Sequence, residues 1–173
     1  SNTKTIMGQA SNQYVAPTDI TDVFSTYLWA GNDATQTINN GVDLAGEGGL
    51  TWIRNRTLAK PHFILDTERG GGKYLSSDTN YEERNTTGYA NSFSFNSNGF
   101  SFTSASDYTN ISGSDYASWT FRKAPKFFDV VTWTGTGGTG SRTIAHNLGT
   151  TVGMLLVKRT SDAEDWTGYH RGV

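Results

Sequence analysis

The sequence matches itself at an offset of 104 residues, and this feature limits the possible folds more than any other. At that offset aromatic, glycine, apolar and basic residues meet residues of the same kind: Phe24 and Phe128, Trp29 and Trp133, Gly31 and Gly135, Gly49 and Gly153, Leu50 and Met154, Ile53 and Val157, Arg54 and Lys158. Seven matches in one register, including Trp and Gly, predict an internal duplication.

The duplication predicts three parts. Residues 1–22 are polar and aperiodic, which is typical of an extended N-terminal docking arm. Residues 23–127 form a complete repeat unit, and residues 128–173 begin a second, truncated unit. That unit would lack counterparts of the strands expected at 92–102 and 116–122. Because a half-sheet with an apolar face needs a cover, we expect the 173 residues to belong to a longer chain.

Alternating apolar and polar residues predict the fold class. The clearest alternation lies at residues 92–95, 99–102 and 116–122, and further strands are expected at 23–29, 35–38, 50–54, 62–66 and 73–75. A helical turn is expected at 81–84. Aromatic residues make up 13% of the chain and the turns hold many of its 20 Gly, which favours strands over helices. We predict an all-β protein, an antiparallel β-sandwich of the jelly-roll or lectin-like kind.

Charge and composition argue against several classes of binding partner. The net charge of −2 provides no domain-wide positive field for nucleic acid. No run of about 18 apolar residues exists, so no membrane insertion is expected. The chain has no Cys, and therefore no thiolate metal site or disulfide. No cofactor is predicted.

Several long motifs resemble a domain of marine, cyanophage-like bacteriophage structural proteins: FSTYLW (24–29), NGVDLAGEGGL (40–50), WIRNR (52–56), DTERG (66–70), FNSNGF (95–100), YASWTFRKAPKFFD (116–129) and IAHNLG (144–149). The resemblance covers residues 23–172. It implies a virion protein of a tail fibre or other appendage, with a lectin-like sandwich and no catalytic residues. It also implies a homotrimer and docking on other virion proteins through residues 1–22.

One group of residues could bind an anionic sugar. Trp52 could stack on a sugar ring, while Arg54, Arg56 and Arg69 could form forked hydrogen bonds. A host surface polysaccharide is therefore a candidate partner. The alternative is structural: Trp52 and Trp119 lie within predicted strands and fit a core position better.

Other motifs favour structural roles. The G-x-G-x-x-G at 135–140 follows a predicted strand at 130–133, but a second strand is predicted at 142–144 instead of a phosphate-binding helix, so a hairpin loop is favoured. The histidines, His62, His146 and His170, are too widely spaced for a metal site or a triad.

The acidic residues fall into two groups. Asp66 and Glu68 favour ion pairs with Arg54 or Arg69, although Asp66 with Glu82 or Glu47 could form the carboxylate pair of a glycoside hydrolase. Oxygen ligands for calcium are also present in loops, but they lack the EF-hand spacing and favour turn capping: Asp33, Asp43, Asp107 and Asp115.

Together with the resemblance to bacteriophage structural proteins, the sequence predicts a non-enzymatic structural component of a phage virion, the particle-proximal part of a tail fibre that supports host attachment. A capsid decoration protein is the alternative. A glycan-cleaving depolymerase is the remote alternative.

Overall fold

The computed structural model describes residues 18–87, 93–103 and 105–172. In these residues the elements are α1 (Ile20–Val23), β1 (Phe24–Ala30), β2 (Gln36–Asn39), α2 (Leu44–Glu47), β3 (Gly49–Asn55), β4 (Phe63–Asp66), β5 (Lys73–Tyr74), β6 (Arg84–Asn85), β7 (Ser94–Asn96), β8 (Gly99–Phe102), β9 (Asp115–Arg122), β10 (Met154–Val157) and β11 (Thr167–His170). None of the helices in this part of the chain is long and apolar enough to cross a membrane.

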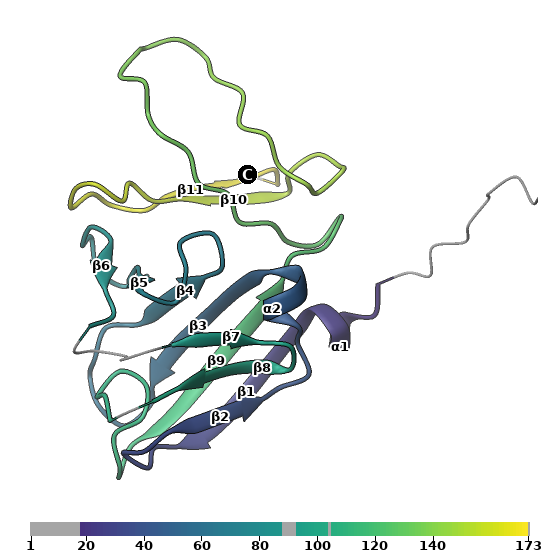
Figure 1. Cartoon of the computed structure of the whole chain (residues 1–173). Coiled ribbons are helices and arrows are strands. Elements are labelled where there is room, and N and C mark those ends of the chain that lie inside the picture. The colour runs from purple at the N-terminus through teal and green to yellow at the C-terminus, as the bar shows by residue number, and fades with distance from the viewer. Residues whose placement is uncertain (1–17, 88–92, 104, 173) are drawn as a thin grey trace, which may run out of the picture.

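Two sheets face one another in the first unit. The larger sheet has the order β1-β9-β3-β4 and the smaller sheet has the order β2-β8-β7. Figure 1 shows the smaller sheet lying across one face of the larger sheet. All strand pairs are antiparallel. The predicted all-β antiparallel sandwich is therefore confirmed.

The core lies between these two sheets. The larger sheet contributes Trp29, Phe63 and Tyr116, and the smaller sheet contributes Phe100 and Phe102. Trp29 stacks on Tyr116 with ring centroids 5.4 Å apart and meets Phe100 edge-on at 5.9 Å. These offset contacts between large rings fill the interior and set the spacing of the layers.

Strand β9 holds the larger sheet together. It pairs along its whole length with β1, from Phe24↔Phe121 to Ala30↔Asp115, and along its other edge with β3. The last strand of the unit is therefore inserted between its first and third strands. Alternation along β9 points Tyr116, Ser118 and Thr120 toward the core, where all three are buried.

The hydroxyl of Tyr116 anchors the loop that precedes β9. It accepts a hydrogen bond from Ile111 N at 3.0 Å and donates toward Ser106 O at 3.2 Å, with Asp107 O at 3.3 Å. Asn55 Nδ2 also donates to this oxygen at 3.3 Å. Burial raises the pKa of Tyr116, partly offset by the backbone hydrogen bond from Ile111.

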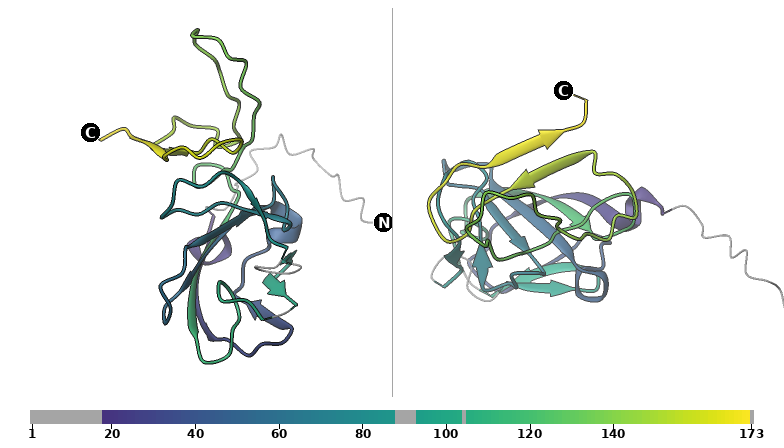
Figure 2. Two further views of the ribbon diagram at one scale, coloured as in Figure 1. Left: turned by 90° about the vertical axis from the view of Figure 1, so that its left-hand side faces the viewer. Right: turned by 90° about the horizontal axis from the view of Figure 1, so that it is seen from above.

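The second unit contains one hairpin, β10–β11, beyond the end of the sandwich (Figures 1 and 2). Its register repeats that of β3–β4 at the offset of 104. Leu50 pairs with Asp66 and Ile53 with Phe63, whereas Met154 pairs with His170 and Val157 with Thr167. This correspondence supports the predicted duplication.

The prediction of strands at 130–133 and 142–144 was wrong, because the structure has no strand at either place. The chain between β9 and β10 instead arches away from the sandwich (Figures 1 and 2). In the first unit the corresponding strands, β1 and β2, pair with β9 and β8. No counterpart of β9 or β8 lies among the described residues of the second unit, so these segments have no strand to pair with.

Two other local predictions were also wrong. The extended arm was expected to reach residue 22, but helix α1 begins at Ile20, with the Asp19 side chain accepting from Thr21 N and Val23 buried against the sandwich. Residues 1–17, the remainder of the predicted arm, lie outside the described residues. The helical turn expected at 81–84 is absent; Arg84 instead pairs with Tyr74 in the β5–β6 ladder.

The Tyr116 hydroxyl gives a test of this architecture. Tyr116→Phe removes the hydroxyl that accepts from Ile111 N and Asn55 Nδ2. Because Ile111 N also donates to Ser106 O and Asn55 Nδ2 also donates to Asp107 O, we expect a loss of about 1 kcal/mol in the free energy of unfolding. Urea denaturation followed by fluorescence measures it. Tyr27→Phe is the matched control, because Tyr27 is 37% exposed, and should change stability by less than about 0.5 kcal/mol. Equal effects would contradict the anchoring role.

Candidate functional site

The face of the larger sheet that points away from the core is rich in aromatic side chains. We call it the outer aromatic face and define it by residues of β1, β3 and β9 and the residue before β4: Phe24, Leu28, Trp52, Arg54, His62, Trp119 and Phe121. Alternation places these side chains opposite to the core residues of the same strands. Leu28 is exposed, and the other strand residues are half-buried.

Two tryptophans form the centre of this face. Trp52 and Trp119 are directly paired across β3 and β9, with ring centroids 5.8 Å apart. The sequence favoured a core position for both, and that expectation was wrong. Strand alternation places both on the outer side, because Thr51, Ile53 and Ser118 occupy the inner side.

His62 fixes the orientation of Trp52. The indole Nε1 donates to His62 Nδ1 at 2.9 Å, and the two rings are 5.8 Å apart. The imidazole Nδ1 must be unprotonated to accept this bond. Burial lowers the pKa of His62, and nearby Arg54 acts in the same direction, while Asp78 opposes them. Sequence spacing gave no sign of this pair, since it joins side chains of adjacent strands.

Phenylalanines extend the face toward the joint between the units. Phe24 and Phe121 are cross-strand partners with ring centroids 5.0 Å apart. Phe128 follows at 5.4 Å from Phe121 and Phe127 at 6.5 Å. The aromatic surface therefore continues from the sheet onto the connector that follows β9.

The structure separates the three predicted sugar-binding arginines. Arg54 lies on the outer aromatic face beside Trp52, and its guanidinium donates to the carbonyl of Lys60. Arg56 is exposed just beyond the end of β3. Arg69 lies elsewhere and is almost completely buried, with its side chain 6% exposed. Of the predicted group, only Trp52 and Arg54 are brought together.

Arg69 is part of a buried ion-pair network. Its Nε donates to Asp66 Oδ2 at 2.6 Å and its Nη2 to Ile64 O at 3.2 Å, while Glu83 lies 3.8 Å away. Asp66 also accepts from Arg69 N at 2.9 Å. The predicted ion pair of Asp66 with Arg69 is confirmed, and it makes both groups structural.

Glu68 and the two glutamates offered as hydrolytic partners of Asp66 belong to separate ion pairs. Glu68 binds Lys123 at 2.7 Å, Glu82 lies 3.5 Å from Arg84, and Glu47 lies 4.0 Å from Arg122. The proposed pairing of Glu68 with Arg54 or Arg69 was therefore wrong.

Capping is confirmed for Asp43, which accepts from Gly46 N at the start of α2. It was wrong for Asp33, which accepts from the distant Ser112 N, and for Asp107, which pairs with Lys60 at 2.6 Å. His146 and His170 each accept a backbone N–H two residues later. No cluster of three His, Asp or Glu suited to a metal occurs among the described residues. The loop at 135–140 is not followed by a helix.

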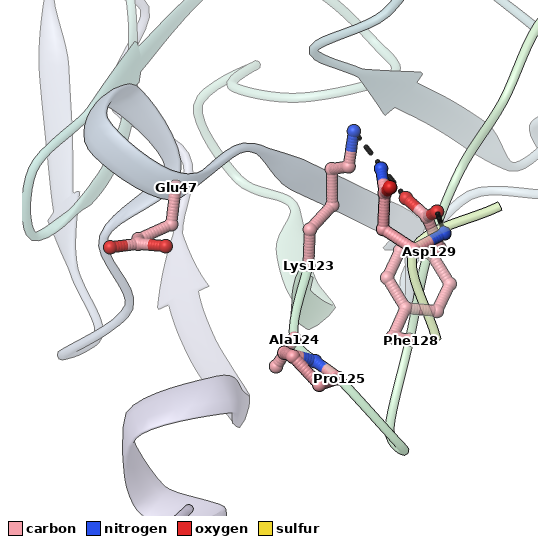
Figure 3. Close-up of a pocket in the computed structure, with 7 residues that line it drawn as sticks. Glu47, Lys123, Ala124, Pro125, Phe128 and Asp129 are labelled. Carbon is pink, nitrogen blue, oxygen red and sulfur yellow. Dashed lines mark hydrogen bonds and ion pairs between the residues drawn. The ribbon is translucent and has the colours of Figure 1, made fainter. Parts of the chain in front are cut away.

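A pocket of about 290 Å³ lies at the joint of the two units (Figure 3). Lys123 crosses it, binding Glu68 at 2.7 Å and Asp129 at 3.4 Å. The hydrogen bond from Lys123 to Glu68 raises the pKa of the ammonium group. Asp129 also accepts from Asn147 N at 2.7 Å. The charged groups at this pocket are thus paired with one another, and they connect the end of β9 to the start of the second unit.

The fold and the face define the class: an antiparallel β-sandwich with an aromatic outer surface. The chain belongs to the family described as a domain of unknown function, DUF7483, whose model matches residues 19–173. No curated protein and no solved structure matches the chain. The match begins at Asp19, the N-cap of α1.

The Arg69 network predicts a large stability effect without a role in binding. Arg69→Met leaves Asp66 buried without its cation, and we expect a loss of about 3–5 kcal/mol in the free energy of unfolding. Thermal and urea denaturation measure it. Arg56→Met, at an exposed position, should stay within about 0.5 kcal/mol of the parent. A loss below about 1 kcal/mol for Arg69→Met would contradict the structural assignment.

His62 predicts a pH-dependent change on the outer aromatic face. Its pKa in the folded protein lies below the ordinary value of 6.5, so the unfolded chain binds the proton first as the pH falls. Stability from this group is complete above pH 6.5 and is lost as the pH falls through that value toward the folded pKa. Stability measured between about pH 8 and 5 should fall less steeply in His62→Gln, which keeps an acceptor but does not titrate. Parallel profiles for the two proteins would show that His62 does not contribute.

Proposed function

We propose that this chain is a non-enzymatic attachment protein of a phage virion, and that its outer aromatic face binds polysaccharide on the host surface. The observation that carries the proposal is the Trp52–Trp119 pair on the outer side of the sheet, with Arg54 beside it. The rings are half-buried and grouped on one surface, and contiguous apolar patches on a protein surface often mark interaction sites.

The chemistry of the face fits a sugar chain. The C–H faces of pyranose rings stack on indole rings, and a row of aromatic groups can contact successive sugars. Arg54 adds a cation whose planar guanidinium suits a uronate or sulfate group. The hydrogen bond from Trp52 to His62 satisfies the indole N–H, so the ring can contact sugars without an unpaired donor.

The particle context rests on the sequence motifs that resemble marine bacteriophage structural proteins. In that setting the segment preceding α1 docks on another virion protein, three copies assemble, and the sandwich faces outward as part of a tail appendage. Purified particles test this directly: mass spectrometry and antibody labelling should place the protein on the tail. Labelling of the head would favour the capsid decoration alternative instead.

Binding is tested on the isolated protein with defined polysaccharides. Alginate, dextran sulfate and neutral dextran serve as probes in affinity electrophoresis. We expect Trp52→Ala and Trp119→Ala each to weaken binding to the anionic chains about tenfold, which corresponds to about 1.4 kcal/mol. Arg54→Gln should reduce the preference for anionic over neutral chains.

Tyr81→Ala is the matched control, because Tyr81 is an exposed aromatic residue that stacks with Arg84 and is not among the residues that define this face. Equal affinity for the tryptophan variants and the parent would contradict the proposal. A reducing-end assay on the same mixtures should show no release of new chain ends. Such release would point to the depolymerase alternative.

A further inference from the structure

The second unit exposes apolar side chains whose counterparts in the first unit are buried. Trp29 is 7% exposed, but Trp133 at the equivalent position is 44% exposed. Leu65 is fully buried, but its equivalent, Tyr169, is 54% exposed. Two positions that are buried in the core of the first unit are therefore occupied by aromatic residues in the second unit, where they are exposed.

A pair of equivalent glycines points to the missing neighbour. In the first unit, a Cβ at Gly49 would lie 2.1 Å from the carbonyl oxygen of Phe121 in β9, so only glycine fits beside that strand. At Gly153 the nearest atom is Arg171 Nε, 3.7 Å away. The described residues therefore leave open space beside Gly153, at the position where β9 packs against Gly49 in the first unit.

A second pair of glycines leads to the same conclusion. A Cβ at Gly31 would lie 2.0 Å from Ile111 O, in the loop that leads into β9. At Gly135, its equivalent, nothing lies within 4 Å. Both glycines of the second unit therefore correspond to positions where the first unit packs backbone from the segment around β9.

The strand edges agree with the glycines. In the first unit β9 pairs with β1 on one edge and with β3 on the other. The counterparts of those strands are residues 128–134 and β10. Among the described residues β10 pairs only with β11, and residues 128–134 form no strand. An unpaired strand edge next to an uncovered apolar face is a site for adding a strand.

We propose that the second unit binds a polypeptide segment that carries the second half of a repeat of this family. A β9-like strand of that segment would enter antiparallel to both residues 128–134 and β10. The core-facing positions of this strand would resemble Tyr116, Ser118 and Thr120. A counterpart of the β7–β8 hairpin, also supplied by the bound segment, would cover Leu155 and Tyr169, which are 45% and 54% exposed.

A second copy of this chain is a poorer occupant. Its β9 is already paired on both edges, and Tyr116 in that strand is fully buried. Donating this strand would open the donor's own core.

The repeat register allows a direct test. Val173 corresponds to Arg69, so residues 70–126 can be appended after Val173 in continuous register. Hydrogen exchange followed by mass spectrometry compares this fusion with the parent. We expect amides of residues 128–134 and 154–157 to exchange at least about tenfold more slowly in the fusion. The control is the same fusion with Trp119→Pro in the appended copy only, which interrupts the added strand and should restore fast exchange.

Equal exchange in both fusions would overturn the proposal. Should the fusion fail to fold, a synthetic peptide of residues 112–124 added to the parent chain provides the same readout, and absence of protection by this peptide also counts against it. Protection in the unfused protein that rises with its concentration, together with a dimer in sedimentation, would assign the site to a second copy and overturn the proposal as well.

Discussion

The fold depends on the insertion of β9 between β1 and β3. This strand closes two ladders at once, and its two faces serve different purposes: Tyr116 completes the core, while Trp119 completes the outer aromatic face. Because β1 and β9 are far apart in sequence, the larger sheet cannot close until nearly the whole unit is available. Strands β1 and β3 are therefore joined by a strand that lies at the end of the unit.

The second unit shows what the same sequence pattern does without that strand. Its hairpin β10–β11 forms in the register of β3–β4, because both partners lie close together in the chain. Residues 128–134 share Phe and Trp with β1 but form no strand. Strand propensity is thus insufficient here, and the presence of a pairing partner decides the outcome.

Much of the fold could be predicted from the sequence because the strands alternate clearly and the turns carry strong signals. The strands around Phe100 and Tyr116 were expected within one residue of where they lie. The faces were harder to assign. Strand β9 has aromatic residues at both parities, Tyr116 on one side and Trp119 with Phe121 on the other, so alternation alone does not identify the core side. The small sheet that covers one face decides it, and its position is a tertiary property.

The candidate site could be predicted only in part for a related reason. Trp52 and Arg54 are two residues apart on one strand, so their shared face follows from local geometry. Arg69 lies beyond the end of β4, where no such rule applies, and it turns inward to neutralise Asp66. The His62–Trp52 hydrogen bond depends on the register of β3 with β4, which no local pattern specifies.

The tryptophans of the sandwich are of two kinds, and the difference bears on the proposed binding of polysaccharide. Trp29 donates its N–H to Thr109 O and is buried, so its ring serves the core alone. Trp52 donates to a histidine at the surface and keeps part of its ring open. Neighbouring Trp119 and the sheet backbone hold that ring in place before any partner arrives. A rigid, pre-oriented aromatic surface loses little conformational entropy on binding, and under the proposed function this would let weak stacking contacts on successive sugars add up.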